Sequence, residues 1–321
     1  MSAGILVLVE QLRGGVADIT FEMLGAARKL AGQRPVHAVL LGRQAAGLAA
    51  RLGGADSVLA VDDPLLDQPS AEAAIAVLQQ VMEQKQATLL LLGGTNVSFG
   101  LGTRLAARTQ LPFVNFCKGI RVDGESLVLT SQLFGGKILS DVRLAQGRGI
   151  VSIYPGAFPA DQGKRDQAPP VEKLAVSVPA PAVVFQQYVE PETGDVDITK
   201  QTVLVAVGRG IQSADNVQLA EELAQSLGGA VCASRPVIDQ GWLPLSRQVG
   251  KSGMSVKPRV YLAFGISGAP EHWDGMQHSE CIIAVNTDPK APIFDGSHYG
   301  VVGDAVELIP LLNEKIRAKK G

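Results

Sequence analysis

Short, almost purely aliphatic runs that alternate with helical patterns constrain the fold of the first half of this chain most strongly. The runs lie at Ile5–Val9, Val36–Leu41, Ser57–Val61 and Thr88–Leu92. A strand that is apolar at successive positions is buried on both faces, as in a parallel sheet covered by helices. The intervening helices are expected over residues 18–30, 44–52, 70–85 and 98–109. This alternation predicts a doubly wound, mostly parallel α/β domain.

The pattern changes after residue 114. The runs Leu127–Leu133, Lys137–Val142 and Gly149–Tyr154 are joined by glycine-containing turns, which predicts an antiparallel extension of the first domain. The stretch from Pro155 to Pro191 is rich in proline, which cannot donate to a strand ladder. We expect a connector there, with one edge strand near Ala182–Tyr188.

A second strand–helix series follows the connector. Its strands are expected at residues 203–207, 230–234, 259–265, 281–286 and 300–304, with helices over residues 215–227 and 305–319. The series predicts a second, parallel α/β domain. The chain should therefore contain two domains, residues 1–190 and residues 191–321.

Charge and composition exclude several classes of partner. The formal net charge is -2, so no global field attracts nucleic acid. The three scattered cysteines match no metal or redox spacing and indicate a reducing compartment. The four histidines also lack any metal-ligand grouping. The run Ile5–Val9 is too short to span a membrane, and no basic segment precedes it. We expect no metal and no membrane insertion, and a cytoplasmic location, with the mitochondrial matrix as the alternative.

The loops that follow the strands of the second domain carry the candidate chemistry. Ligands of an open parallel sheet bind at the carboxyl ends of its strands, where turns present backbone N–H groups to anions. Arg209 and Arg235 each follow a strand and offer a guanidinium group to a phosphate. The glycine-rich stretch Gly265–His272 adds the hydroxyl group of Ser267 and the titratable ring of His272.

Each of these features also has an ordinary structural explanation. Arg209 and Arg235 can be solvated turn residues, and Pro270 can simply begin a helix. The loop Gln248–Gly253 has two glycines but lacks the spacing of a Walker phosphate-binding loop. The sequence also lacks the Gly-x-Gly-x-x-Gly fingerprint at a strand–helix turn and any evident catalytic triad or carboxylate pair.

Taken in order, however, the segments resemble the C-terminal half of electron transfer flavoprotein alpha subunits. The first half is similar to the family more loosely, at Phe134–Leu139. Each match is short, but the ordered set is specific. The matching segments of the second half are Val207–Ile211, Ala233–Arg235, Gln248–Gly253, Gly265–His272, Gly275-Met276, Ile283–Phe294 and Tyr299–Asp304.

The resemblance implies an electron carrier rather than an enzyme in its own right. Such a chain forms a heterodimer with a beta subunit and holds FAD mainly in its C-terminal domain. Flavin-dependent dehydrogenases would donate electrons, and a quinone- or ferredoxin-linked acceptor would receive them. The resemblance leaves open whether the heterodimer bifurcates electrons, which needs a second flavin that the family places largely on the beta subunit.

The resemblance also assigns residues to the cofactor. Arg235 would lie against the isoalloxazine ring, Ser252 would reach flavin N5, and His272 would reach the C2 carbonyl. A cation and a hydrogen-bond donor at these places favour a negatively charged reduced flavin. Motif matching predicts that the cofactor is lined by Arg209, Ser234, Arg235, Gln248, Val249, Gly250, Lys251, Ser252, Ser267, Gly268, Ala269, Pro270, Glu271, His272, Asn286 and Asp304.

One position departs from the family pattern. Family members usually have Gln before the histidine of this stretch, whereas this chain has Glu271. A neighbouring carboxylate raises the pKa of a histidine, so we expect Glu271 and a protonated His272 to form a charge pair. The alternative is that Glu271 points to solvent and its charge is screened.

Two other functions compete with the carrier. One is a nicotinamide nucleotide-binding oxidoreductase or transhydrogenase-like module, against which the missing fingerprint counts. The other is a non-redox module that binds an adenine nucleotide and regulates a partner. The identity of the released cofactor distinguishes all three.

Overall fold

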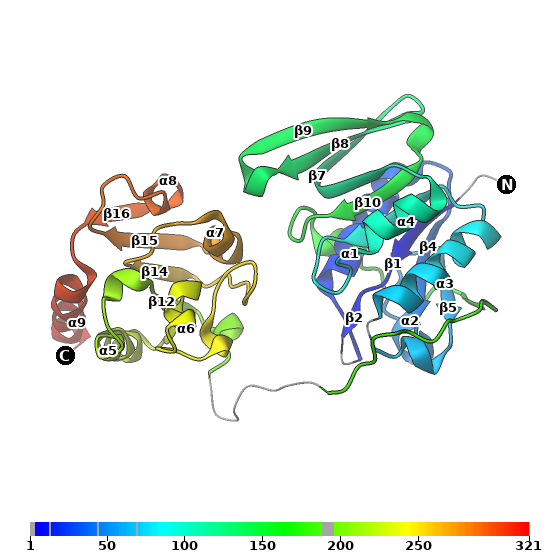
Figure 1. Cartoon of the computed structure of the whole chain (residues 1–321). Helices are drawn as coiled ribbons and strands as arrows, with labels where there is room; N and C mark the ends of the chain where they lie inside the picture. Colours follow the sequence, from blue (N-terminus) through cyan, green and yellow to red (C-terminus); the bar gives the residue numbers. More distant parts are fainter. Residues whose placement is uncertain (1–3, 13, 44, 69, 188–195, 321) are drawn as a thin grey trace. The chain divides into compact units, whose positions relative to one another are not determined.

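The structure is a computed structural model that describes residues 4–12, 14–43, 45–68, 70–187 and 196–320. It separates into two compact units, Met1–Gln187 and Tyr188–Gly321 (Figure 1). The domain boundary expected between residues 190 and 191 lies outside the described residues.

A nine-stranded sheet forms the N-terminal unit, in the order β11-β5-β4-β1-β6-β10-β7-β8-β9. All pairings from β11 to β7 are parallel. Because β1, β6 and β10 are buried at every residue, only apolar or small side chains fit there. These parallel strands are β1 (Ile5–Leu8), β4 (Val36–Leu41), β5 (Ser57–Val61), β6 (Leu89–Gly93), β10 (Gly149–Ile153) and β11 (Val171–Lys173).

Helices cover both faces of this sheet. The helices α1 (Asp18–Ala31) and α2 (Ala45–Ala49) contribute to one apolar cluster, which contains Ile5 and Val7 of β1. The helices α3 (Ala71–Gln84) and α4 (Leu101–Thr109) contribute to the other cluster, on the opposite face. The doubly wound arrangement predicted from the sequence is confirmed.

An antiparallel arm extends the sheet beyond β10. It consists of β7 (Phe113–Asp123), β8 (Ser126–Leu133) and β9 (Ile138–Leu144), drawn in green in Figure 1. The expected extension is therefore present, but one assignment to it was wrong. The run at residues 149–154 forms β10, which lies between β6 and β7 and pairs in parallel with both, because its side chains are buried on both faces.

Two further short pairings were not expected. The strands β2 (Gln11–Leu12) and β3 (Gly15–Val16) form a small hairpin directly after β1. The connector contributes the exposed strand β11 to the edge of the sheet, beside β5. The edge strand expected near residues 182–188 is not a strand over 182–187, and Tyr188 lies outside the described residues.

The C-terminal unit contains a five-stranded sheet that is parallel throughout, in the order β13-β12-β14-β15-β16. This result confirms the predicted fold class of the second domain. The strands are β12 (Val203–Val207), β13 (Ala230–Ala233), β14 (Val260–Phe264), β15 (Cys281–Asn286) and β16 (Tyr299–Val302).

Helices again lie on both faces. One apolar cluster joins the sheet to α5 (Val217–Leu227), α6 (Arg235–Asp239) and α9 (Ala305–Lys320). The opposite cluster includes Met276 of α7 (Pro270–Met276) and Ile293 of α8 (Ile293–Gly296). Because all five strands are parallel, their carboxyl ends lie at one edge of the sheet.

Within the described parts of the chain, no helix is both long enough and apolar enough to cross a membrane. The same residues contain no group of three or more His, Cys, Asp or Glu side chains placed to hold a metal ion.

Candidate site at the carboxyl edge of the C-terminal sheet

The winding of the C-terminal sheet reverses beside its central strand. From β12 the chain moves to β13 on one side and then crosses to β14 on the other side. Such a switch point is the usual place for a ligand in an open α/β sheet. The loops that meet there begin at Gly208, after β12, and at Gly265, after β14.

Glycines allow these two loops to pack directly on each other. The Gly210 N–H group donates to the Gly265 carbonyl group at 3.1 Å, and Gly208 donates to Phe264 at 2.8 Å. A Cβ atom at Gly208 would lie 2.3 Å from the Gly265 oxygen, and one at Gly210 would lie 2.7 Å from the Gly265 Cα atom. Gly265 itself has a φ of 63°. These glycines therefore serve contact between loops, and any cofactor must lie over them rather than between them.

Positively charged and hydroxyl side chains gather around this packed centre. Arg209 follows β12, and Arg235 begins α6 at the end of β13, where its Nε atom lies 3.4 Å from Asp239. Because all strands are parallel, their following loops lie at one edge of the sheet. The predicted residues with exposed side chains at this edge are Arg209, Arg235, Lys251, Ser252, Ser267, Ala269, Pro270 and Glu271.

The loop Gln248–Met254 is tied to the sheet and to α7. The Val249 N–H group donates to Ala233 at the end of β13 at 2.9 Å. The Lys251 N–H group donates to the Glu271 carbonyl group at 2.7 Å. The buried Gln248 side chain donates to the Ser252 hydroxyl group at 2.9 Å, so this hydroxyl group is oriented from within the loop.

Two predicted residues at later strand ends hold loops together. The Asn286 side chain donates to the Ile266 carbonyl group at 2.9 Å, which links the loop after β15 to the loop after β14. Asp304 accepts from the Val306 N–H group at 2.8 Å and from the Gln212 side chain at 3.0 Å. Both contacts are typical of Asn and Asp side chains that stabilise turns.

Gln212 is a residue of this edge that sequence reasoning missed. Its φ of 74° is in the region that favours glycine, and its side chain joins the loop after β12 to Asp304. Nothing in the sequence marks a glutamine for such a conformation.

His272 behaves differently from expectation. Its ring is buried, and its Nε2 and Nδ1 atoms lie 2.9 Å from the Tyr261 hydroxyl group and 3.0 Å from the Val249 carbonyl group. Burial lowers the pKa of His272 to about 4, so the ring is neutral near pH 7. The predicted charge pair with Glu271 is therefore wrong. The physical reason is that successive helical residues point in different directions, and Glu271 faces solvent while His272 faces the core.

The donor set at this edge fits a dinucleotide such as FAD. Its diphosphate requires cations and N–H donors, and its sugar and ring atoms require hydroxyl and amide partners. Arg209, Arg235 and Lys251 supply the cations, and Ser252 and Ser267 supply hydroxyl groups. Ser234, Val249, Gly250 and Gly268 are buried within the loops that present them.

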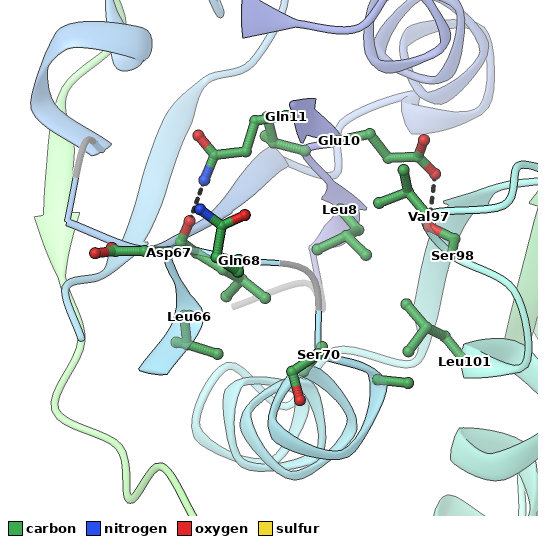
Figure 2. A pocket seen from close by; sticks show the side chains of 14 residues that line it. Leu8, Glu10, Gln11, Leu66, Asp67, Gln68, Ser70, Val97, Ser98 and Leu101 are labelled. Atoms are coloured by element: carbon green, nitrogen blue, oxygen red, sulfur yellow. Dashed lines mark hydrogen bonds between the residues drawn. The ribbon is translucent and has the colours of Figure 1, made fainter. Parts of the chain in front are cut away.

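A pocket lies in the N-terminal unit, at the carboxyl ends of β1 and β4 (Figure 2). Its floor is apolar, with Leu8, Leu66 and Leu101, and its polar side chains include Glu10 and Asp67. Among the described residues that line it there is no Lys or Arg. This pocket therefore suits a diphosphate less well than the edge of the C-terminal sheet does.

Comparison with known proteins agrees with this assignment. The family model described as "Electron transfer flavoprotein domain" matches residues 5–179, and "Electron transfer flavoprotein FAD-binding domain" matches residues 197–277. The second match includes most of the loops described above.

Three bacterial relatives are similar to this chain over nearly all of its length. The "Electron transfer flavoprotein subunit alpha" of Bacillus subtilis is 34% identical over 319 residues, which are 99% of this chain and 98% of the relative. The "Acryloyl-CoA reductase electron transfer subunit beta" of Anaerotignum propionicum is 33% identical over 98% of this chain and 96% of its own length. The "Lactate dehydrogenase (NAD(+),ferredoxin) subunit LctC" of Acetobacterium woodii is 34% identical over 96% of this chain and 76% of its own length.

The matches cover both units and nearly the whole chain. The chain therefore belongs to the family of electron transfer flavoprotein alpha subunits and is an electron carrier that binds FAD.

Proposed function

We propose that this chain holds FAD at the carboxyl edge of its C-terminal sheet, within a domain of residues 191–321. The observation that carries the proposal is that the exposed side chains of Arg209, Arg235 and Lys251 lie in loops at one edge of the sheet. Arg209 follows β12, Arg235 follows β13, and Lys251 lies in the loop 248–254, which is hydrogen-bonded to the end of β13. When bound, FAD accepts and releases the electrons. The protein residues bind it, orient it and set the charge around it.

The roles of the individual residues follow from their positions. The guanidinium group of Arg235 lies at the end of β13 and would stabilise negative charge on the reduced ring. The Ser252 hydroxyl group, oriented by Gln248, would face the ring edge. Arg209 and Lys251 would bind the diphosphate, with backbone groups of the loop 267–271 along the ribityl chain. Asn286 and Asp304 would border the nucleotide end.

We further propose that the chain works as a heterodimer with a beta subunit, through the N-terminal domain of residues 1–190. The name "subunit alpha" of its relatives supports a second subunit. Flavin-dependent dehydrogenases would supply electrons, and a quinone- or ferredoxin-linked acceptor would take them. The bacterial relatives favour the cytoplasm as its location.

Electron bifurcation by the heterodimer is the second candidate function. The relative named as a subunit of a lactate dehydrogenase that uses NAD(+) and ferredoxin favours it. The nicotinamide-binding oxidoreductase that the sequence left as an alternative is not supported by the family model, which describes an FAD-binding domain.

Co-production with the candidate beta subunit, followed by flavin and nucleotide quantification, tests these proposals. We expect a stable heterodimer with one FAD that depends on this chain. A second flavin in the complex would support bifurcation. A colourless complex that releases only a nicotinamide nucleotide would contradict the carrier.

A further inference from the structure

A strained turn centred on Gln212 ends the loop that follows β12. The Ser213 N–H group donates to the Ile211 carbonyl group at 2.9 Å, so Gln212 is the middle residue of a γ-turn. Its φ of 74° and ψ of −39° give the form of this turn with positive φ, which is rare and strained. Such strain persists only where the surrounding structure holds the turn in place.

Contacts on both sides hold the backbone of this turn. The side chain of Ile211 is fully buried in the apolar cluster that also contains residues of α5 and α9. The Ile211 carbonyl group also accepts from the Asn216 side chain at 2.9 Å. The Gln212 N–H group donates to the Arg209 carbonyl group at 3.1 Å. The direction in which the Gln212 side chain leaves the loop is therefore fixed.

That side chain reaches the end of another strand. The Gln212 Nε2 atom lies 3.0 Å from the Asp304 Oδ2 atom, and a carboxylate can only accept, so the amide group donates. The other Asp304 oxygen accepts from the Val306 N–H group at 2.8 Å, in the first turn of α9.

The contact spans a large part of the sheet edge. Gln212 follows β12 and Asp304 follows β16, and the strands β14 and β15 lie between these two in the sheet. The loop after β12 also packs on Gly265, at the end of β14. The Gln212 side chain therefore bridges the ends of two intervening strands and ties this loop to the start of α9.

We propose that Gln212 is a positioning residue for the nucleotide half of FAD, because its bridge holds Arg209 and Asp304 at the separation that the ADP moiety needs. The inference rests on the proposed function, which places Arg209 at the diphosphate and Asp304 at the nucleotide end, and it deepens that function. The strained turn supports it. Glycine would adopt this backbone without strain, whereas only a residue with a long donor side chain can also reach Asp304.

The bridge acts on one half of the cofactor only. It involves neither Arg235 nor Ser252, which the proposed function places at the flavin ring. Its loss should therefore reduce the affinity for FAD and for ADP alike, and leave the reduction potential of the bound flavin unchanged. A general loosening of the unit would change all three quantities.

Two substitutions in the full chain with its partner subunit separate the bridge from the turn. Gln212→Met keeps an uncharged, unbranched side chain of similar length but has no amide donor, and Gln212→Gly also removes the backbone strain. We expect both variants to bind FAD about fivefold more weakly, the effect of one lost hydrogen bond to a charged group. ADP, measured as a competitor of FAD, should lose affinity by the same factor. The first reduction potential should stay at the wild-type value.

The matched control is Gln218→Met, at an exposed position of α5, which should change none of these quantities. Urea unfolding should show that Gln212→Gly is more stable than Gln212→Met, because only glycine relieves the strain. Equal or lower stability of the glycine variant overturns the argument from the strained turn, and the proposal with it.

The failures are distinguishable. A wild-type complex that binds neither FAD nor ADP overturns the proposed function together with this proposal. If the wild type binds both ligands and Gln212→Met or Gln212→Gly binds them equally well, the role of the bridge alone is overturned. Loss of FAD affinity with unchanged ADP affinity, or with a shifted reduction potential, also overturns it, because the bridge would then act at the flavin ring.

Discussion

Arg235 combines a fixed charge with a strand-end position. It is the first residue of α6 and follows the buried Ser234 directly, so its backbone is well fixed while its side chain is exposed. A guanidinium group stays protonated at all accessible pH values, and its field favours every negatively charged state of a neighbouring ring.

Arg235→Ala should lower the first reduction potential of the bound flavin by roughly tens of millivolts, because one partly screened charge contact is lost. FAD affinity should change less. Redox titration measures the potential. Arg259→Ala is the matched control, since Arg259 is an exposed arginine just before β14, at the opposite edge of the sheet. Equal potentials for the Arg235 variant and the wild type would mean that this side chain does not lie beside the flavin ring.

The neutral state of His272 links the site to pH stability. The pKa of His272 in the folded unit is lowered to about 4 from an ordinary 6.5, so the unfolded chain binds a proton that the folded unit does not. The contribution of this ring to the free energy of unfolding is fully present above pH 6.5 and decreases as the pH falls toward 4.

The free energy of unfolding of the C-terminal unit should therefore decrease by about 2 kcal/mol between pH 7 and pH 5 on account of this ring. Urea titrations at both pH values measure the decrease. His272→Asn should reduce the pH dependence, because its amide does not titrate. The same pH dependence in the variant would show that other groups cause it.

At the scale of elements, Glu10 joins the end of β1 to the turn after β6. Its buried carboxylate accepts from the hydroxyl groups of Thr95 at 2.7 Å and Ser98 at 2.5 Å, and Figure 2 shows the contact with Ser98. Gly93 leaves room for the carboxylate, since a Cβ atom there would lie 2.2 Å from Glu10 Oε1. Burial raises the pKa of Glu10 despite these bonds.

Glu10→Ala should destabilise the N-terminal unit by about 3 kcal/mol, because two hydroxyl groups lose their acceptor and a buried space opens. Chemical denaturation of the variant measures the loss. Glu125→Ala, in the exposed turn between β7 and β8, is the control and should change stability by less than about 0.5 kcal/mol. Similar small losses for both variants would mean that water replaces the carboxylate.

The elements differ in how far the sequence could predict them. The fully buried strands can be predicted from their aliphatic runs, because both of their faces are in the core. The strand β7 was missed, since its polar residues, its register shift between Cys117 and Gly119 and the φ of 49° at Phe116 break the alternation. The segment 182–187 has strand-forming residues but no pairing, whereas Val171–Lys173 pairs with β5 and becomes β11. In both cases the formation of a strand depended on pairing with a segment that is distant in the sequence.

At the scale of the whole molecule, the order of the motifs predicted the family, and parallel strands explain why distant motifs come to one edge. The direction in which each side chain points could not be predicted. The glycines at positions 208, 210 and 265 proved to serve contacts between loops. His272, next to an exposed glutamate, proved to be buried against Tyr261. Packing that involves several elements set both outcomes.

The central claim, that the C-terminal unit holds FAD, is tested most directly by titrating FAD into each unit separately. The fragments are residues 1–187 and 196–321, with circular dichroism to establish that each is folded. We expect saturable FAD binding by the fragment 196–321, weakened by Arg209→Ala together with Lys251→Ala, and none by the fragment 1–187. FAD binding by the folded N-terminal fragment alone would contradict the account.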